Sequence, residues 1–371
     1  MSASSYEEDF TGNVVAPDFE SYVVFAELLD PLIRDLHCVT ASGELPDQPT
    51  ARFFQDDDAD SPSTTTKGRE RSVREVAEYL ELRNLDPSGK YIMAGVVECT
   101  RNLESHQLPL TMRIKELEDT ERIVTGALMG PELTNILAEG SSEDEAGTYY
   151  TLSELLDPDN ETRSRLAASG LLLPLTETES SDERRLHGKH WPYGRGVFVT
   201  SAADLAVWVN VQDHIRVICC SSENVPALVG RAYLRLARVV GVLDRTFRFR
   251  RHPKLGFLTS RPCALGNTLR FDVIVKFPGL SKNPEDLKHL CVVRGLRIHP
   301  TLRKDSVRLG NQQSLAIGEL QTYYDFDRAI INVLTLEKEL AFSSSSKIAT
   351  AIANLFKRRR RSNSRRGSIR P

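Results

Sequence analysis

The sequence predicts an α+β protein whose larger domain is an antiparallel β-sheet flanked by helices. The first observation is a hairpin signal, because Val197–Thr200 and Leu205–Val211 are apolar, β-branched runs joined by the polar turn Ser201–Asp204. The second is an amphipathic helical pattern over Val225–Leu243, which lies between two groups of predicted strands. The third is size, since 371 residues with 40% hydrophobic side chains can form a packed core.

The first 85 residues predict a small helical domain. Residues 1–11 are predicted to be flexible, and Ala16–His37 is predicted to be a helix that Pro31 breaks or kinks. Residues 40–72 are poor in core residues and predict a loop or a disordered insert. Ser72–Leu85 predicts a second helix. The apolar residues that indicate the first helix recur every fourth position and are Val24, Leu28, Leu32 and Leu36.

Residues 86–341 predict the larger domain, with a polar loop over Thr176–Lys189. The predicted strands are Tyr91–Cys99, Val197–Thr200, Leu205–Val211, Ile215–Cys219, Gly256–Thr259, Leu269–Phe277 and Cys291–Leu296. The predicted helices are Leu110–Leu137, Val225–Leu243, Asn283–Leu290 and Gln313–Leu340.

Composition favours a reduced, cytoplasmic protein. No apolar run approaches the roughly 18 residues that span a bilayer, and the acidic start MSASSYEEDF does not resemble a secretory signal. The six cysteines include no CxxC pair and are too sparse for a disulfide scaffold. No histidine stands at zinc-ligand spacing to them, so we predict no metal site.

A basic tail follows the globular part. Residues 342–371 predict a Ser-rich linker and a disordered tail, of which 357–371 read KRRRRSNSRRGSIRP. This tail holds eight of the 48 basic residues, which leaves 40 against 51 acidic residues in the rest of the chain. Such a tail predicts binding to acidic protein, nucleic-acid or lipid surfaces, with nuclear or cytoskeletal association, or else a solvated segment without a specific partner.

Several long motifs occur in an order typical of one known family. They include LDPSGKYI, WPYGRGVF, VWVNVQDHIR, LGFLTSRPCALGNTLRFDVIVKFP and VVRGLR. Over residues 12–341 the chain resembles the phosphagen (ATP:guanidino) kinases, and arginine kinase in particular. The resemblance implies a helical N-terminal domain and a sheet-based C-terminal domain that transfers the γ-phosphoryl group of Mg·ATP to a guanidinium. Only 15 residues precede Ala16, so we expect a truncated N-terminal domain.

The resemblance assigns three arginines to the ATP phosphates. They are Arg216 in DHIR, Arg270 in GNTLR and Arg294 in VVRG, and each is expected to end or follow a strand. Arginine suits this role because its planar fork binds phosphate oxygens and keeps its charge. A single such arginine is more often a solvated surface residue, but three at matching positions favour a shared anionic pocket for Mg·ATP or Mg·ADP.

Other positions that the family uses are replaced. Two further phosphate arginines align with Val96 and Glu98, and two residues near the adenine align with Val199 and Ile274, which we expect to pack in the core. The two carboxylates that hold the guanidinium align with Gln212 and His299. The reactive cysteine aligns with Arg261, two residues before Cys263.

These replacements leave three hypotheses. The first is a catalytically impaired family member, a pseudokinase that acts as a binding or scaffold protein and retains weak nucleotide affinity. The second is an active ATP:guanidino phosphotransferase with low or altered activity, although the loss of both carboxylates argues against a guanidino substrate. The third is a structural protein that docks through its basic tail. The sequence does not specify an oligomeric state.

Overall fold

The computed structural model describes residues 14–39, 44–51, 73–138, 147–157, 159–173, 188–301, 303 and 305–342. The predicted flexible start, most of the predicted insert and the basic tail lie outside these residues. No helix in the described part of the chain is both long and apolar enough to cross a membrane.

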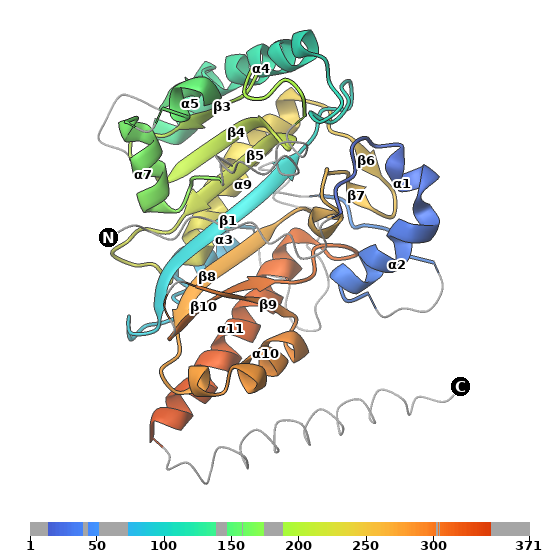
Figure 1. Cartoon of the computed structure of the whole chain (residues 1–371). Coiled ribbons are helices and arrows are strands. Elements are labelled where there is room, and N and C mark those ends of the chain that lie inside the picture. The colour runs from blue at the N-terminus through green and yellow to red at the C-terminus, as the bar shows by residue number, and fades with distance from the viewer. Residues whose placement is uncertain are drawn as a thin grey trace.

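An eight-stranded antiparallel sheet forms the body of the protein, as the sequence predicted (Figure 1). Its order is β2-β3-β4-β5-β1-β8-β10-β9, so the N-terminal strand β1 lies in the middle, between β5 and β8. The strands are β1 (Ile92–Arg101), β2 (Thr148–Thr151), β3 (Gly196–Val199), β4 (Leu205–Val211), β5 (Asp213–Cys220), β8 (Arg270–Lys276), β9 (Leu296–Pro300) and β10 (Ser306–Asn311). A separate two-stranded ribbon joins β6 (Arg251–His252) and β7 (Gly256–Phe257).

Helices pack around this sheet. The helices that follow β1 in the chain are α4 (Ile114–Leu128), α5 (Pro131–Ala138), α6 (Leu152–Leu155), α7 (Glu161–Ser169), α9 (Val229–Thr246), α10 (Pro284–Val293) and α11 (Glu319–Phe342). The N-terminal helices are α1 (Ser21–Val24), α2 (Ala26–Leu36) and α3 (Val73–Leu82), and the short 3₁₀ turns are η1 (Pro262–Ala264) and η2 (Leu280–Lys282).

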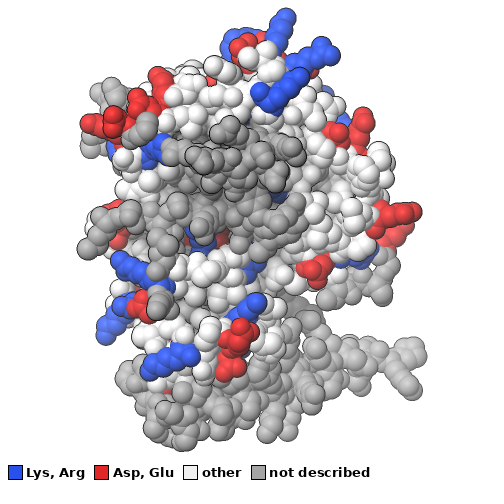
Figure 2. Space-filling model, viewed as in Figure 1, with Lys and Arg blue, Asp and Glu red and all other residues white. Residues whose placement is uncertain are grey.

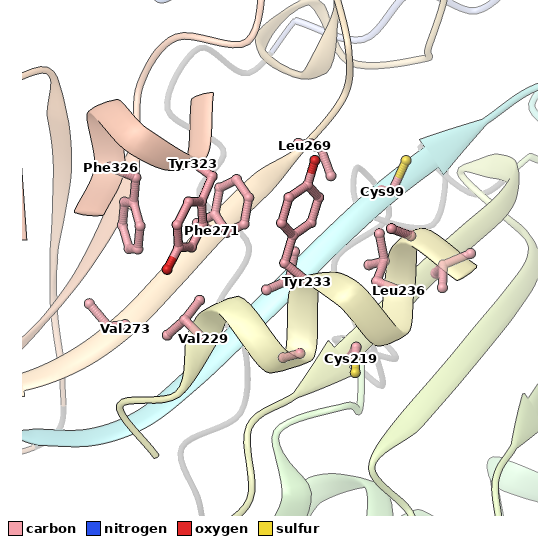
Figure 3. Packing of buried hydrophobic residues seen from close by; sticks show 14 of the residues in the cluster. Cys99, Cys219, Val229, Tyr233, Leu236, Leu269, Phe271, Val273, Tyr323 and Phe326 are labelled. Atoms are coloured by element: carbon pink, nitrogen blue, oxygen red, sulfur yellow. The ribbon is translucent and has the colours of Figure 1, made fainter. Parts of the chain in front are cut away.

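One face of the sheet is covered by α9, α11 and α3, and the main core lies there. Successive residues of a strand point to opposite faces, so Val97 and Cys99 of β1 face this core. Figure 3 shows its aromatic centre, where Tyr233 of α9 stacks on Tyr323 of α11 with ring centroids 5.9 Å apart. Phe271 of β8 meets the Tyr323 ring edge-on at 5.6 Å. Side chains on the opposite face of the central strands therefore do not pack against these helices.

The helices α1 and α2 form a small core of their own with later parts of the chain. Leu29 and Ile33, four residues apart on α2, are buried there together with Leu258 and Leu265. The predicted break at Pro31 is wrong, because α2 continues through it and the interruption comes earlier, at Phe25. As the sixth residue of α2, Pro31 lacks the N–H that would donate to the carbonyl of Glu27, and the helix continues without that hydrogen bond.

Two predicted segments need correction. Leu110–Leu137 is not one helix, because Pro131 starts a new one and separates α4 from α5. Cys291–Leu296 is not a strand: its first three residues end α10 and only Leu296 begins β9. A short apolar run is compatible with a strand or with a buried helix. Here the run continues a helix that began at Pro284, so its first residues are helical.

Candidate anion-binding site

Strand register brings three charged residues to one face of the sheet. Glu98 of β1 lies directly opposite Arg270 of β8, and Thr100 lies opposite Arg216 of β5. Because side chains alternate along a strand, Glu98 and Thr100 share a face, and so Arg216, Glu98 and Arg270 do as well. This is the face that α9 and α11 leave uncovered.

Glu98 holds two of the arginines directly. Both of its oxygens accept from Arg216, with Nε to Oε1 at 2.7 Å and Nη2 to Oε2 at 2.9 Å. Nη2 of Arg261 donates to the same Oε1 at 3.1 Å. The Glu98 side chain is 6% exposed and that of Arg216 is 3% exposed, so this ion pair is shielded from solvent. We call Glu98, Arg216, Arg261 and Arg270 the Glu98 cluster.

The electrostatics of the cluster keep Glu98 ionised. Burial alone would raise the pKa of its carboxyl group, but the charges of Arg216, Arg261 and Arg270 outweigh burial and hold that pKa well below its usual range. Nearby Cys263, Glu98 and Asp272 likewise raise the pKa of Arg270 against the opposing effect of burial. Glu98 is therefore ionised at neutral pH, and it faces guanidinium groups, which keep their charge in proteins.

The loop that carries Arg261 is anchored by the N-terminal helices. Ala16 donates its backbone N–H to the carbonyl of Ser260 at 2.8 Å, and the Tyr22 hydroxyl donates to the carbonyl of Thr259 at 2.8 Å. His37 Nε2 lies 2.9 Å from the carbonyl of Pro262. The guanidinium of Arg261 is thus placed by contacts on both sides of it in the chain.

A second ion pair borders the cluster on β8. Asp272 Oδ1 lies 3.9 Å from Nη2 of Arg297 on β9, across the intervening strand β10. Gly310 of β10 makes this approach possible, because a Cβ there would stand 2.3 Å from Asp272 Oδ1. Arg297 thereby neutralises the carboxylate next to Arg270.

The expectation that each phosphate arginine ends or follows a strand is wrong in detail. Arg216 is the fourth residue of β5, Arg270 begins β8, and Arg294 caps the C-terminus of α10. Only the first two are brought to Glu98 by strand pairing. The rigid support of a central sheet therefore applies to Arg216 and Arg270.

The two positions aligned with guanidinium carboxylates lie on different elements. Gln212 links β4 to β5 with a left-handed φ of 70°, and His299 lies within edge strand β9, opposite Arg308. The segment around His299 is the strand β9. Neither residue supplies a negative charge.

Three of the replaced positions, Val96, Val199 and Ile274, are apolar. Val199 is buried in a second core cluster on the same face as Glu98, as predicted, and Val96 lies in the same cluster. Ile274, which was also expected to pack in the core, is only half-buried on β8. Cys263 is half-buried in η1. Among the described residues, no group of three or more His, Cys, Asp or Glu side chains is arranged to hold a metal ion.

Sequence reasoning missed the ion pair itself. It identified Glu98 as a negative charge in the place of an arginine, but not as the partner of Arg216 and Arg261. The available signal was the presence of one acid, Glu98, among the basic residues of the same set of motif positions. The order of strands, which decides the pairing, is not encoded in any short motif.

Comparison with known proteins agrees with this geometry. Residues 129–340, more than half of the chain, match the model of the ATP:guanido phosphotransferase C-terminal catalytic domain. The chain belongs to the ATP:guanido phosphotransferase family. The arginine kinase of Procambarus clarkii is 28% identical over 334 residues, which cover 88% of this chain and 82% of that protein. The arginine kinase of Penaeus monodon is 27% identical with the same coverage.

Solved structures of the family have the same fold. The duplicated taurocyamine kinase of Schistosoma mansoni, with bound transition-state analogue components, superposes with a TM-score of 0.66 at 26% identity, over 87% of this chain and 40% of that chain. Lombricine kinase superposes with a TM-score of 0.63 over 90% of this chain and 83% of its own, at 22% identity. The guanidino kinase fold expected from the sequence is thus confirmed.

Proposed function

We propose that this guanidino kinase family member is a pseudokinase that acts as a binding or scaffold protein. The carrying observation is the two-pronged bond between Glu98 and Arg216, since the Nε–Nη2 edge of this guanidinium already holds a carboxylate. A phosphate group that approached the same edge would have to displace Glu98, and one that approached elsewhere on the guanidinium would still meet the negative charge of Glu98. In a productive phosphate site, by contrast, the guanidinium N–H groups are free to donate to the oxygens of the incoming phosphate.

The substrate side supports the same proposal. Gln212 and His299 offer no carboxylate to orient a guanidinium. Arg261 adds a positive charge, and two like charges about 4 Å apart repel by about 4 kcal/mol at the effective dielectric of a protein surface. One missing transition-state contact commonly costs on the order of 10²–10³ in rate, and several together leave activity near background although the losses do not add.

Weak nucleotide binding is the second candidate function. Three guanidinium groups of the Glu98 cluster face one carboxylate, so the cluster keeps excess positive charge. Such a site supports binding of the phosphates of ATP or ADP without productive transfer. Arg294 is included in this proposal by its motif alone.

A phosphotransfer assay tests the proposal. Purified protein is incubated with Mg·ATP and each of three guanidino acceptors, namely arginine, taurocyamine and lombricine, and ADP release is measured. We expect turnover at background with all three. The Arg216→Ala variant serves as the control for contaminating kinases. Turnover that is clearly above background in the native protein and is lost in this variant would overturn the proposal and favour an active phosphotransferase.

A further inference from the structure

The N-terminal helices expose an apolar surface that the site does not use. Val23, Val24, Phe25 and Leu28 are 74%, 69%, 56% and 68% exposed, and they are adjacent at the junction of α1 and α2. We call these four residues the α1–α2 stripe. Large apolar side chains scattered singly are normal on a protein surface, whereas a contiguous group marks an interaction site.

Acidic residues surround the stripe. Glu20, Glu27 and Asp30 are all exposed on the same two helices. Figure 2 shows acidic side chains along the edge of the molecule where Figure 1 places α1 and α2. An apolar surface with a negative rim is complementary to a partner that combines an apolar face with positive charge.

The chain itself carries a segment of that chemistry. Residues 347–361 read KIATAIANLFKRRRR, and they follow the last described helix. The apolar residues Ile348, Ile352, Leu355 and Phe356 have the spacing of one helical face, and basic residues stand at both ends. This segment matches the stripe in both polarity and charge.

Geometry favours the tail of a second copy over the tail of the same chain. Shortly before α11 the chain passes the end of α2, where the backbone N–H of Ser314 donates to His37 Nδ1 at 3.4 Å, and α11 then runs away from α2 (Figure 1). Its 24 residues are about 36 Å long. The four residues 343–346 can reach at most about 14 Å, so if the segment that follows folds as a helix when it docks, its apolar residues fall well short of the stripe of its own chain.

We propose that residues 347–361 of one copy dock on the α1–α2 stripe of another copy. The apolar face of the segment covers Val24 and Leu28, and its arginines face Glu27 and Asp30. This contact is independent of the Glu98 cluster and of any nucleotide. It gives the basic tail a specific partner, and high salt weakens it because part of the attraction is between exposed charges.

Sedimentation velocity on the full chain tests this, at concentrations up to about 100 µM where even weak association is detectable. We expect the mass to rise with concentration and to fall when salt is raised. A stripe variant, Val24→Asp with Leu28→Asp, and a tail variant, Ile352→Asp with Leu355→Asp, should each weaken association roughly tenfold or more. Leu82→Asp is the matched control, since Leu82 is 76% exposed on α3 and should be without effect.

Mixing the variants tests the pairing directly. The stripe variant keeps an intact tail and the tail variant keeps an intact stripe, so the two should associate with each other although neither associates with itself. A monomeric full chain at all concentrations would overturn the proposal. So would association lost in the tail variant but kept in the stripe variant, which would place the tail on another surface, or a failure of the mixed variants to associate.

Discussion

Replacing Glu98 by glutamine removes the carboxylate that Arg216 and Arg261 share. The substitution keeps the size of the side chain and one hydrogen-bond acceptor, but it leaves three guanidinium groups without their central negative charge. Removing one partner of a buried ion pair costs about 3–5 kcal/mol in stability. Because glutamine still accepts one hydrogen bond, we expect about 3 kcal/mol for Glu98→Gln.

Chemical denaturation followed by circular dichroism measures this loss, with and without inorganic phosphate. An anion that replaces the missing carboxylate stabilises the folded variant by mass action, about 2.7 kcal/mol at one hundred times its dissociation constant. We therefore expect phosphate to stabilise Glu98→Gln more than the native protein. Glu118→Gln is the control, because Glu118 is exposed on α4. A loss below about 1 kcal/mol, or equal effects of phosphate on both proteins, would refute the reasoning.

The decrease in the free energy of unfolding at acid pH is an independent test of the same cluster. The pKa of Glu98 is depressed in the folded state, so its contribution is complete above the usual glutamate pKa of 4.5 and is lost as pH falls below it. The native protein should thus lose stability in acid more steeply than Glu98→Gln. Parallel acid limbs would show that Glu98 is not held ionised by its neighbours.

Three further predictions concern the surroundings of the site. Burial lowers the pKa of His37 from 6.5 to about 4. As the pH falls, the unfolded chain therefore takes up this proton before the folded chain does, and the free energy of unfolding should fall by roughly 3 kcal/mol between those pH values. Urea denaturation at a series of pH values should show a smaller decrease over this range after His37→Gln. Leu29→Ala should cost about 2–4 kcal/mol in the same denaturation assay and Leu28→Ala less than about 0.5, because Leu29 is buried and Leu28 is exposed; equal losses would contradict this difference in burial. Gly310→Ala should cost about 1–3 kcal/mol, because its Cβ collides with Asp272, and an unchanged urea midpoint would contradict this.

The fold was predictable because its signals are local and agree with one another. The hairpin of β3 and β4, the strand β8 and the helix α9 each lie within a few residues of their predicted positions. The short strands β2 and β10 were missed. Their pairing partners, β3 for β2 and both β8 and β9 for β10, determine them more than their own composition does.

The first helix shows why a period alone does not identify the buried face. The apolar residues that indicated this helix included Val24 and Leu28, which are exposed in the structure, whereas Leu29 and Ile33 face the core. Both sets have helical spacing, so the sequence of this segment is apolar on two sides. Only the position of the loop around Thr259 and Pro262, which packs against one side, decides between them.

The site was predictable as a set of residues but not as a set of contacts. The family motifs located Arg216, Arg270 and the replaced positions in the chain. The pairing of Glu98 with Arg216 depends on β1 lying between β5 and β8, although β1 precedes both by more than a hundred residues. Long-range strand order of this kind is set by the whole core and not by local sequence.

Calorimetric titration with Mg·ADP, in the presence and absence of arginine, tests the central claim most directly. It compares the native protein with Glu98→Gln at physiological salt. If Glu98 occupies the place of a phosphate, the variant should bind ADP roughly tenfold or more tightly than the native protein, equivalent to about 1.4 kcal/mol, and arginine should strengthen neither. Tight binding of ADP by the native protein that arginine strengthens would contradict the account, because it would show a working site for both substrates.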